Sequence, residues 1–378
     1  MTRIRQASVT ASCAGWGREM EHDRWPHGFS DGAGGSLARL RERASAFFEG
    51  LSVTDLVRET QRKSWISDWT RVGDDYRMLA ESARGASPAH IVSESYLCAL
   101  TAFEVARSLS YSEDPASIVL ADKIGLSLSK LEDCFTKPIE RAEIDCFDQG
   151  TLQGLFLPAA CVEPSAPAII CVGDEEVTLS SMLSRLFPAA LRRRVSLLLI
   201  DGRNASVFRS SKPEHVLGCW LDYLNGRSDV DSSRIAVYGE GAGASHASRL
   251  AGSDRRITAA VCDGGLWASH RRQASVRWIT GAWQEADRSS IRPLRISRTI
   301  PCPILMVVGS RSMVREEDAL ELQAGYRQSG AHCSIVIPNA IQNPLGEVEN
   351  FIAVDDFVFD WFDDKLGSAR QLDPLTYL

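Results

Sequence analysis

The chain has 378 residues, of which 44% are hydrophobic and 24% are charged, so it is long enough to bury a large core. Its formal net charge of −7 argues against a nucleic-acid partner. No stretch of 18 or more apolar residues is present, and the first twenty residues lack the apolar core of a signal peptide. We therefore expect a cytoplasmic globular protein that acts on a small molecule, without a membrane partner.

Ten cysteines are scattered along the chain, and none belongs to a Cys-x-x-Cys pair. Cys171 and Cys262 lie inside apolar, strand-like runs. We expect the cysteines to be buried reduced thiols, and no spacing of His and Cys predicts a metal site. The sequence also lacks the glycine-rich motifs that bind dinucleotides or nucleoside triphosphates, so we expect a mechanism without a cofactor.

The first part of the chain has the apolar periodicity of helices. Apolar residues recur at spacings of three and four over 36–51, 54–83, 88–110 and 116–135. Four such helices cannot each bury an apolar face alone, so they must pack on one another, on the rest of the chain or on a second subunit. We predict an N-terminal helical domain over residues 1–140.

After residue 140 the pattern alternates between strand and helix, which is typical of a doubly wound sheet. The predicted strands cover 144–147, 152–157, 168–172, 195–200, 234–238, 259–262, 304–308 and 334–337. The first two strands form an antiparallel hairpin, and a helix over 355–366 closes the domain. We therefore predict a second, α/β domain over residues 141–378, in which an eight-stranded, mostly parallel sheet has helices on both faces.

A run of five residues after the fifth predicted strand resembles the turn that carries the nucleophile in Gly-x-Ser-x-Gly motifs. It reads Gly239-Glu240-Gly241-Ala242-Gly243, and a helix-forming segment of small residues follows. We interpret Glu240 as the residue at the nucleophile position. The dipole of the following helix favours an ionised carboxylate there, which suits a proton acceptor or a covalent nucleophile.

A second carboxylate, Asp263, follows the sixth predicted strand. Neighbouring parallel strands lie roughly 5 Å apart and end at the same edge of a sheet, where ligands bind. Two carboxyl groups so close would separate their pKa values and divide the roles of base and proton donor between Glu240 and Asp263. Alternatively, Asp263 caps the loop or helix beyond it.

Other polar groups follow the remaining strands at this edge. The substrate-binding candidates are Gly173, Asp174, Arg203, Asn204, Gly241, Trp267, His270 and Arg311. Asp174 alternatively belongs to the acidic start of the next helix, and an arginine facing Glu240 would equally form a structural ion pair. Residues 266–301 form a long insertion whose tryptophans would line a cap over an aromatic substrate or pack that cap onto the helical domain.

Nearly the whole chain resembles the α/β-hydrolase superfamily, and within it the group of FrsA and 2,6-dihydroxypseudooxynicotine hydrolase. The residues that carry the resemblance are Gly85-Ala86-Ser87-Pro88-Ala89-His90, Ile200-Asp201-Gly202, the run from Val230 to Gly239 and the run from Arg256 to Val261. The resemblance implies a helical domain that roofs the site and contributes to a homodimer. It also implies hydrolysis of esters or of carbon–carbon bonds in 1,3-dicarbonyl-like substrates.

The catalytic triad of this group does not carry over to the sequence. Glu240 stands at the nucleophile position, Ser312 where the acid is expected, and Leu345 nearest the place of the histidine. Three functions remain open. The first is an enzyme of secondary metabolism that uses Glu240 as general acid or base on a small carbonyl-rich substrate, in cyclisation, dehydration, isomerisation or carbon–carbon cleavage. The second is a non-catalytic binding module, and the third is a hydrolase in which Glu240 is the nucleophile or activates water.

Overall fold

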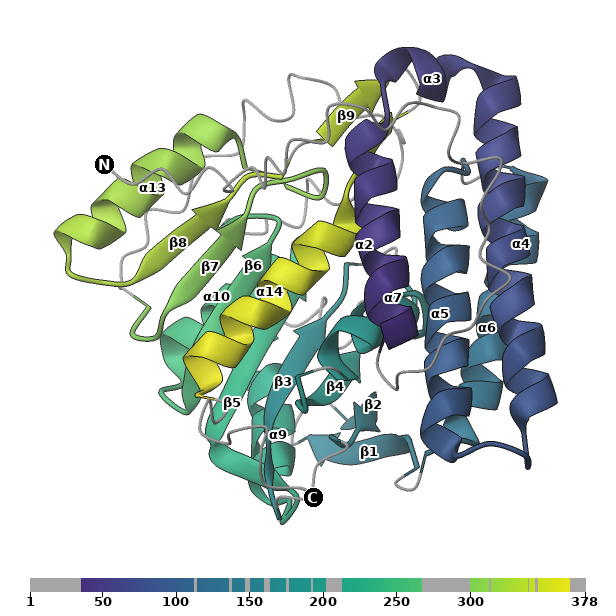
Figure 1. The fold of residues 1–378 in the computed structure, drawn as a ribbon. Coiled ribbons are helices and arrows are strands. Elements are labelled where there is room, and N and C mark those ends of the chain that lie inside the picture. The colour runs from purple at the N-terminus through teal and green to yellow at the C-terminus, as the bar shows by residue number, and fades with distance from the viewer. Residues whose placement is uncertain are drawn as a thin grey trace, which may run out of the picture.

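Figure 1 shows the fold in a computed structural model, in which a group of helices lies beside a twisted sheet that has further helices on its faces. The structure describes residues 35–111, 114–135, 138–146, 150–159, 164–174, 177–191, 193–201, 213–266, 300–312, 314–338, 340–343 and 346–367.

The first helices form a group around α5. Their bounds are Gly35–Gly50 for α2, Val53–Val57 for α3, Glu59–Ala83 for α4, Ala89–Ser108 for α5 and Pro115–Glu132 for α6. α5 is buried on nearly every side because α2, α4, α6 and the later helix α7 all pack against it. The predicted helical ranges are confirmed, with a break at Arg58 that divides 54–83 into α3 and α4. The boundary between two domains near residue 140 stays a prediction.

The large sheet has eight strands in the order β1-β2-β4-β3-β5-β6-β7-β8. The strands are β1 Glu140–Cys146, β2 Gly150–Leu157, β3 Ala166–Val172, β4 Ser196–Ile200, β5 Val230–Glu240, β6 Ile257–Asp263, β7 Ile304–Val307 and β8 Cys333–Val336. β1 and β2 pair antiparallel, as do β2 and β4, and the other neighbours are parallel. All eight predicted strands and the mostly parallel sheet are confirmed.

Helices cover both faces of this sheet. The helices of the second part are α7 Leu179–Leu191, α9 Pro213–Asn225, α10 Ala242–Ser253, α13 Glu316–Gln328 and α14 Phe351–Leu366. α7 and α14 share one hydrophobic cluster with α2, α4, α5 and α6, whereas α9, α10 and α13 contribute to a second cluster on the opposite face. Successive strand residues alternate between the clusters, as the pleat requires: Ile169 and Cys171 belong to the first, Ile170 and Val172 to the second.

A small hairpin, which the sequence did not predict, lies outside the large sheet. Its strands are β9 Ala340–Asn343 and β10 Gly346–Glu349, paired antiparallel. At four residues each, these strands are too short to give a periodic signal. β10 ends where α14 begins, and this connection brings Glu349 to the edge of the large sheet, as the next section describes.

One prediction about the cysteines is wrong. Cys146 at the end of β1 and Cys219 on α9 form a disulfide, because the two elements pack together and bring the Cα atoms to 5.9 Å. The reduced state is confirmed for the other described cysteines, which are Cys98, Cys134, Cys171, Cys262, Cys302 and Cys333. None of the helices in the described part of the chain is both long and apolar enough to cross a membrane.

Candidate active site at the carboxyl edge of the sheet

The tight turn between β5 and α10 is centred on Gly241. Its backbone has φ 54° and ψ −121°, a conformation that a residue with a Cβ adopts only under strain. Glu240 is instead the last residue of β5. In a Gly-x-Ser-x-Gly motif the serine is the third residue, and the third residue of the run that begins at Gly239 is Gly241. The prediction that Glu240 occupies the nucleophile position is therefore wrong by one residue.

The space for a side chain at this turn is filled by another carboxylate. A Cβ added to Gly241 would lie 2.1 Å from Oδ2 of Asp174, which follows β3 and is 8% exposed. Gly173 also lies beside this turn, since a Cβ there would lie 3.9 Å from Oε1 of Glu240. Two predicted binding residues thus lie against the turn, with Asp174 in the place of the missing side chain.

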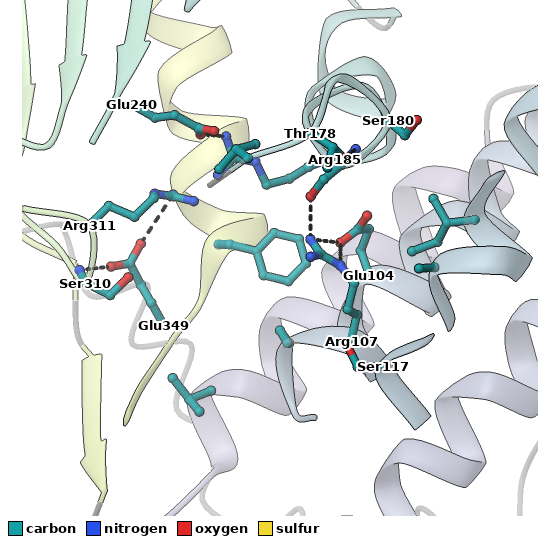
Figure 2. A pocket seen from close by; sticks show the side chains of 17 residues that line it. Glu104, Arg107, Ser117, Thr178, Ser180, Arg185, Glu240, Ser310, Arg311 and Glu349 are labelled. Atoms are coloured by element: carbon teal, nitrogen blue, oxygen red, sulfur yellow. Dashed lines mark hydrogen bonds and ion pairs between the residues drawn. The ribbon is translucent and has the colours of Figure 1, made fainter. Parts of the chain in front are cut away.

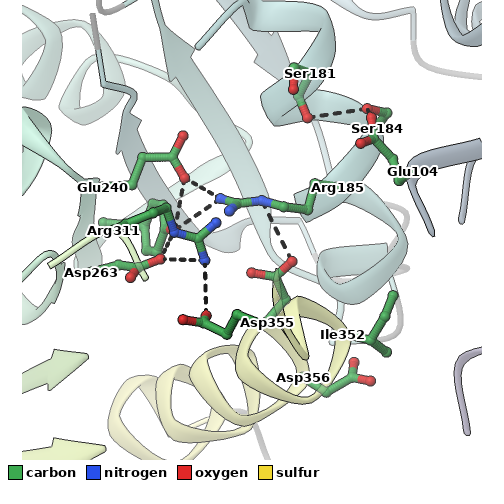
Figure 3. Close-up of polar contacts among 12 residues, drawn as sticks. Glu104, Ser181, Ser184, Arg185, Glu240, Asp263, Arg311, Ile352, Asp355 and Asp356 are labelled. Carbon is green, nitrogen blue, oxygen red and sulfur yellow. Dashed lines mark hydrogen bonds and ion pairs between the residues drawn. The ribbon is translucent and has the colours of Figure 1, made fainter. Parts of the chain in front are cut away.

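Glu240 lies at the centre of a buried polar cluster (Figure 3). Its side chain is 0% exposed, and its Oε2 accepts hydrogen bonds from Nη2 of Arg185 and from the Tyr238 hydroxyl, the latter at 3.2 Å. The other oxygen, Oε1, has no hydrogen-bond partner among the described residues. One half of the carboxylate is therefore fixed by a guanidinium and a phenol, and the other half is unsatisfied.

Asp263 joins this cluster through Tyr238. Glu240 and Asp263 are direct partners in the β5–β6 register, as predicted, and the Tyr238 hydroxyl lies 2.8 Å from Oδ2 of Asp263. Burial, together with the charges of Glu349 and Glu240, raises the pKa of Asp263 well above its ordinary value. The Tyr238 hydroxyl can donate to Asp263 or to Glu240, so it links the two carboxyl groups.

Arg185 is shared between two carboxylates from opposite sides. Its Nη2 contacts Glu240, and its Nε lies 3.6 Å from Oδ2 of Asp355 on α14. The Arg185 side chain is 9% exposed and that of Asp355 1%. Burial raises the pKa of Asp355 to about 7, although Arg185 and Arg41 act in the opposite direction. Tyr238, Arg185 and Asp355 were not predicted from the sequence.

Arg311 approaches the same cluster from the loop after β7. Its Nη2 lies 2.9 Å from Oδ2 of Asp263 and 3.8 Å from Oε1 of Glu349. Nε and Nη2 are both buried, and neither contact has the geometry of a hydrogen bond. Oε2 of Glu349 accepts a hydrogen bond from the backbone N–H of Ser310, 2.6 Å away. Ser312 bonds only backbone groups of the loop and of Gly264.

A cavity of about 460 Å³ opens beside this cluster (Figure 2). Glu240, Arg185, Arg311 and Glu349 line it on the side of the sheet. The helical side is formed by α5, α6 and the start of α7, with lining residues that include Glu104, Arg107, Ser108, Ser117, Thr178, Ser180 and Ser181. Among the described lining residues none is a histidine, and no group of His, Cys, Asp and Glu in the described part of the chain is arranged to hold a metal.

A second polar cluster lies on this helical wall. Glu104 is 3% exposed and accepts hydrogen bonds from Ser184 and from Nε of Arg107, the latter at 2.8 Å. Nη2 of Arg107 donates to the Ser181 hydroxyl, also at 2.8 Å. In contrast to Arg185, the Arg107 side chain is 37% exposed. This cluster was not predicted from the sequence, because it depends on how α5 packs against α7.

The structure brings together six of the predicted site residues, which are Gly173, Asp174, Glu240, Gly241, Asp263 and Arg311. Of these, Glu240 and Arg311 line the cavity. The other four candidates, Arg203, Asn204, Trp267 and His270, lie outside the described residues, as does most of the predicted cap over 266–301. Chemically, the assembled groups can hold a small polar ligand and move protons within a water-poor site.

Comparison with known proteins identifies the fold. The sequence matches no protein-family model and no curated protein. Among solved structures, that of 2,6-dihydroxy-pseudo-oxynicotine hydrolase is similar with a TM-score of 0.55 and 16% identity, over 88% of this chain and 98% of that one. The Pyrococcus furiosus esterase Pf2001 has a TM-score of 0.47 and 16% identity, over 61% of this chain and 93% of the esterase. The strand order, the turn after β5 and the first of these similarities together show that the chain has the α/β-hydrolase fold.

Proposed function

We propose that this protein is an enzyme that binds a small carbonyl-containing molecule in the cavity and transforms it by general acid–base catalysis through Glu240. The observation that carries the proposal is the state of the Glu240 carboxylate, which lines the cavity with one oxygen fixed and the other without a hydrogen-bond partner among the residues that the structure describes. A buried polar atom that lacks a partner costs about 1–3 kcal/mol, so its retention at a cavity wall favours a role in function.

The neighbouring groups support a proton-transfer role. Tyr238 links Glu240 to Asp263, and burial raises the pKa of Asp263, which favours its protonated form. Arg185 holds Glu240 in one orientation, and Arg311 can polarise a carbonyl oxygen. These elements suit cyclisation, dehydration, isomerisation or carbon–carbon cleavage, each of which can be assisted by a general acid or base beside a carbonyl group. A place in secondary metabolism fits such substrates.

Covalent catalysis has less support. Gly241 at the turn has no nucleophile, and Glu240 stands one residue earlier, at the end of a strand. Of the three triad positions identified from the sequence, the first moves to Gly241, Ser312 is bonded to the backbone, and Leu345 lies outside the described residues. A hydrolase in which Glu240 activates water would use the same base, but the proton would come from water and not from the substrate.

A non-catalytic binding module is the second candidate. The ion pair between Arg185 and Glu240 favours it, because a carboxylate neutralised by a buried guanidinium can serve structure alone. In that case the cavity would bind a ligand without changing it. The two candidates differ in whether any bond is broken or formed when the ligand is bound.

The test compares the wild type with Glu240→Gln, which keeps the size of the side chain and removes its basicity. Turnover of cyclic and acyclic 1,3-diketones, hydroxyketones, aryl esters and epoxides would be followed by mass spectrometry. We expect turnover of a carbonyl probe by the wild type and a loss of at least about a hundredfold in the variant. Glu143→Gln, on the exposed edge strand β1, is the matched control and should behave as the wild type.

Folding of the variants would be checked by circular dichroism and thermal unfolding. Equal turnover by the wild type and a folded Glu240→Gln protein would remove Glu240 from the mechanism. Binding of the probes without any turnover by the wild type would favour the binding module.

A further inference from the structure

The cavity presents positive charge and hydroxyl groups, although its lining contains as many glutamates as arginines. The three glutamates, Glu104, Glu240 and Glu349, have side chains that are at most 4% exposed. Two of the three arginines are much more accessible, with Arg107 at 37% and Arg311 at 24%. A ligand in the cavity therefore meets the guanidinium groups before it meets the carboxylates.

Each glutamate is also turned toward a partner in the wall. Glu104 accepts from Ser184 and Arg107, Glu240 from Arg185 and Tyr238, and Glu349 from the N–H of Ser310. Burial raises the pKa of the nearby Asp263 and Asp355, which disfavours their charged forms. Among the described lining residues of the cavity, three arginines balance three glutamates.

Arg107 has the surroundings of an anion anchor. Its Nε and Nη2 are held by Glu104 and Ser181, which fixes the plane of the guanidinium, while Nη1 makes no hydrogen bond in the described part of the chain. Hydroxyl groups of Ser117, Ser180 and Thr178 line the same wall of the cavity. A fixed guanidinium with neighbouring hydroxyls is suited to a carboxylate.

Arg311 reaches the cavity from the opposite side (Figure 2). It makes two ion pairs, and its buried Nε and Nη2 donors have no hydrogen-bond partner in the described part of the chain. It lies in the wall that also contains Glu240, the proposed base. Apolar side chains line the cavity as well, namely Ala121, Ile124, Val177, Val348 and Phe351.

We propose that the ligand is an oxo-carboxylic acid whose carboxylate binds Arg107 and whose carbonyl oxygen binds Arg311, with an apolar chain between them. The assignment rests on the proposed function, since it places the reacting carbonyl beside Glu240. Beyond the proposed function, the assignment states that the end of the substrate away from the reacting carbonyl is anionic and is recognised by the helical wall. The helices then select the substrate, and the edge of the sheet acts on it.

The experiment measures binding by isothermal titration calorimetry with a length series of straight-chain oxo acids, from 4-oxopentanoate to 8-oxononanoate, and their methyl esters. For the best length we expect the acid to bind at least about tenfold more tightly than its ester. In Arg107→Met the acid and the ester should bind alike, whereas Arg107→Lys should keep part of the preference because it keeps the charge. Arg311→Met should weaken acid and ester together. Arg327→Met, an exposed position on α13, is the control and should match the wild type.

Several outcomes would overturn the proposal. These are an acid that binds no better than its ester, a preference that survives in a folded Arg107→Met variant, or the failure of every oxo acid to bind. Inorganic phosphate that binds Arg107 as tightly as the best acid would replace the carboxylate class by a phosphorylated one. Turnover of the best acid is measured in the wild type as well, so an acid preference in a wild type that shows no turnover would reject the proposed function and leave this inference standing.

Discussion

The two polar clusters that face each other across the cavity contain the same kinds of group in different environments. The cluster at the edge of the sheet, defined by Arg185, Tyr238, Glu240, Asp263 and Asp355, is buried throughout. The cluster on the helical wall, defined by Glu104, Arg107, Ser181 and Ser184, contains an arginine that is partly exposed. The cluster at the edge of the sheet has three carboxyl groups and one arginine, whereas the cluster on the helical wall has one carboxyl group and one arginine. We therefore expect the stability of the buried cluster to depend on pH, and the partly exposed arginine of the other cluster to be available to a ligand.

The difference between the two clusters is tested most directly by replacing Arg185 and Arg107 in turn. Arg185→Met leaves Glu240 and Asp355 buried without their cation, so we expect a loss of about 3–5 kcal/mol in the free energy of unfolding. Arg107→Met should cost only about 1–2 kcal/mol, because Ser184 still bonds Glu104. Urea unfolding followed by circular dichroism measures both, and equal losses would show that burial does not separate the clusters.

A change at the turn tests how tightly the edge of the sheet is packed. Gly241→Ala places a Cβ at φ 54° and 2.1 Å from Asp174 Oδ2, so we expect a loss of about 2–4 kcal/mol from strain and overpacking. Adding Asp174→Ala should recover the packing part of that loss. Gly125→Ala on α6, where a Cβ would meet nothing within 4 Å, is the control and should stabilise the protein slightly. An unchanged stability of Gly241→Ala would contradict the observed turn.

Asp355 should also give the stability of the protein a pH dependence. Its pKa is about 7 in the folded protein, above the ordinary value of 3.8, so the native state binds more protons than the unfolded state between about pH 4 and pH 7. Stability from this group should therefore fall as pH rises through that window, by up to about 1.4 kcal/mol per pH unit. Asp355→Asn, compared with the wild type by urea unfolding at pH 5 and pH 7, should remove this slope. If the free energy of unfolding has the same slope against pH in both proteins, the slope comes from another group.

The sequence predicted the large sheet because each strand is an apolar run with clear boundaries. It predicted that Glu240 and Asp263 are neighbours for the same reason, since the ends of adjacent parallel strands are fixed by topology. The register of the turn was missed although counting from Gly239 already places the third residue of the motif at Gly241. The backbone at Gly241 agrees with that position.

The partners of Glu240 were missed because charged residues on apolar helices give no strong periodic signal. A weak one exists: Asp355 lies in the apolar stripe of α14 with Phe351, Val358 and Phe362, all of them buried. Similarly, Tyr238 precedes Glu240 by two residues and must share its face of the strand. The helical wall of the cavity could not be predicted, because it depends on the packing of two parts of the chain against each other.

The contact between α2 and α14 has a consequence for the order in which the protein can form. Arg41 bonds Asp356 across a separation of 315 residues, and both helices belong to the hydrophobic cluster that also lies beneath the cavity. A ribosome that adds about 5–20 residues per second needs about 15–60 s to make that length of chain. During synthesis, α2 emerges long before α14, so Phe48, which packs on Phe351 of α14, has to wait with that side uncovered. Until α14 is made, α2 is therefore open to chaperones and to aggregation on this side.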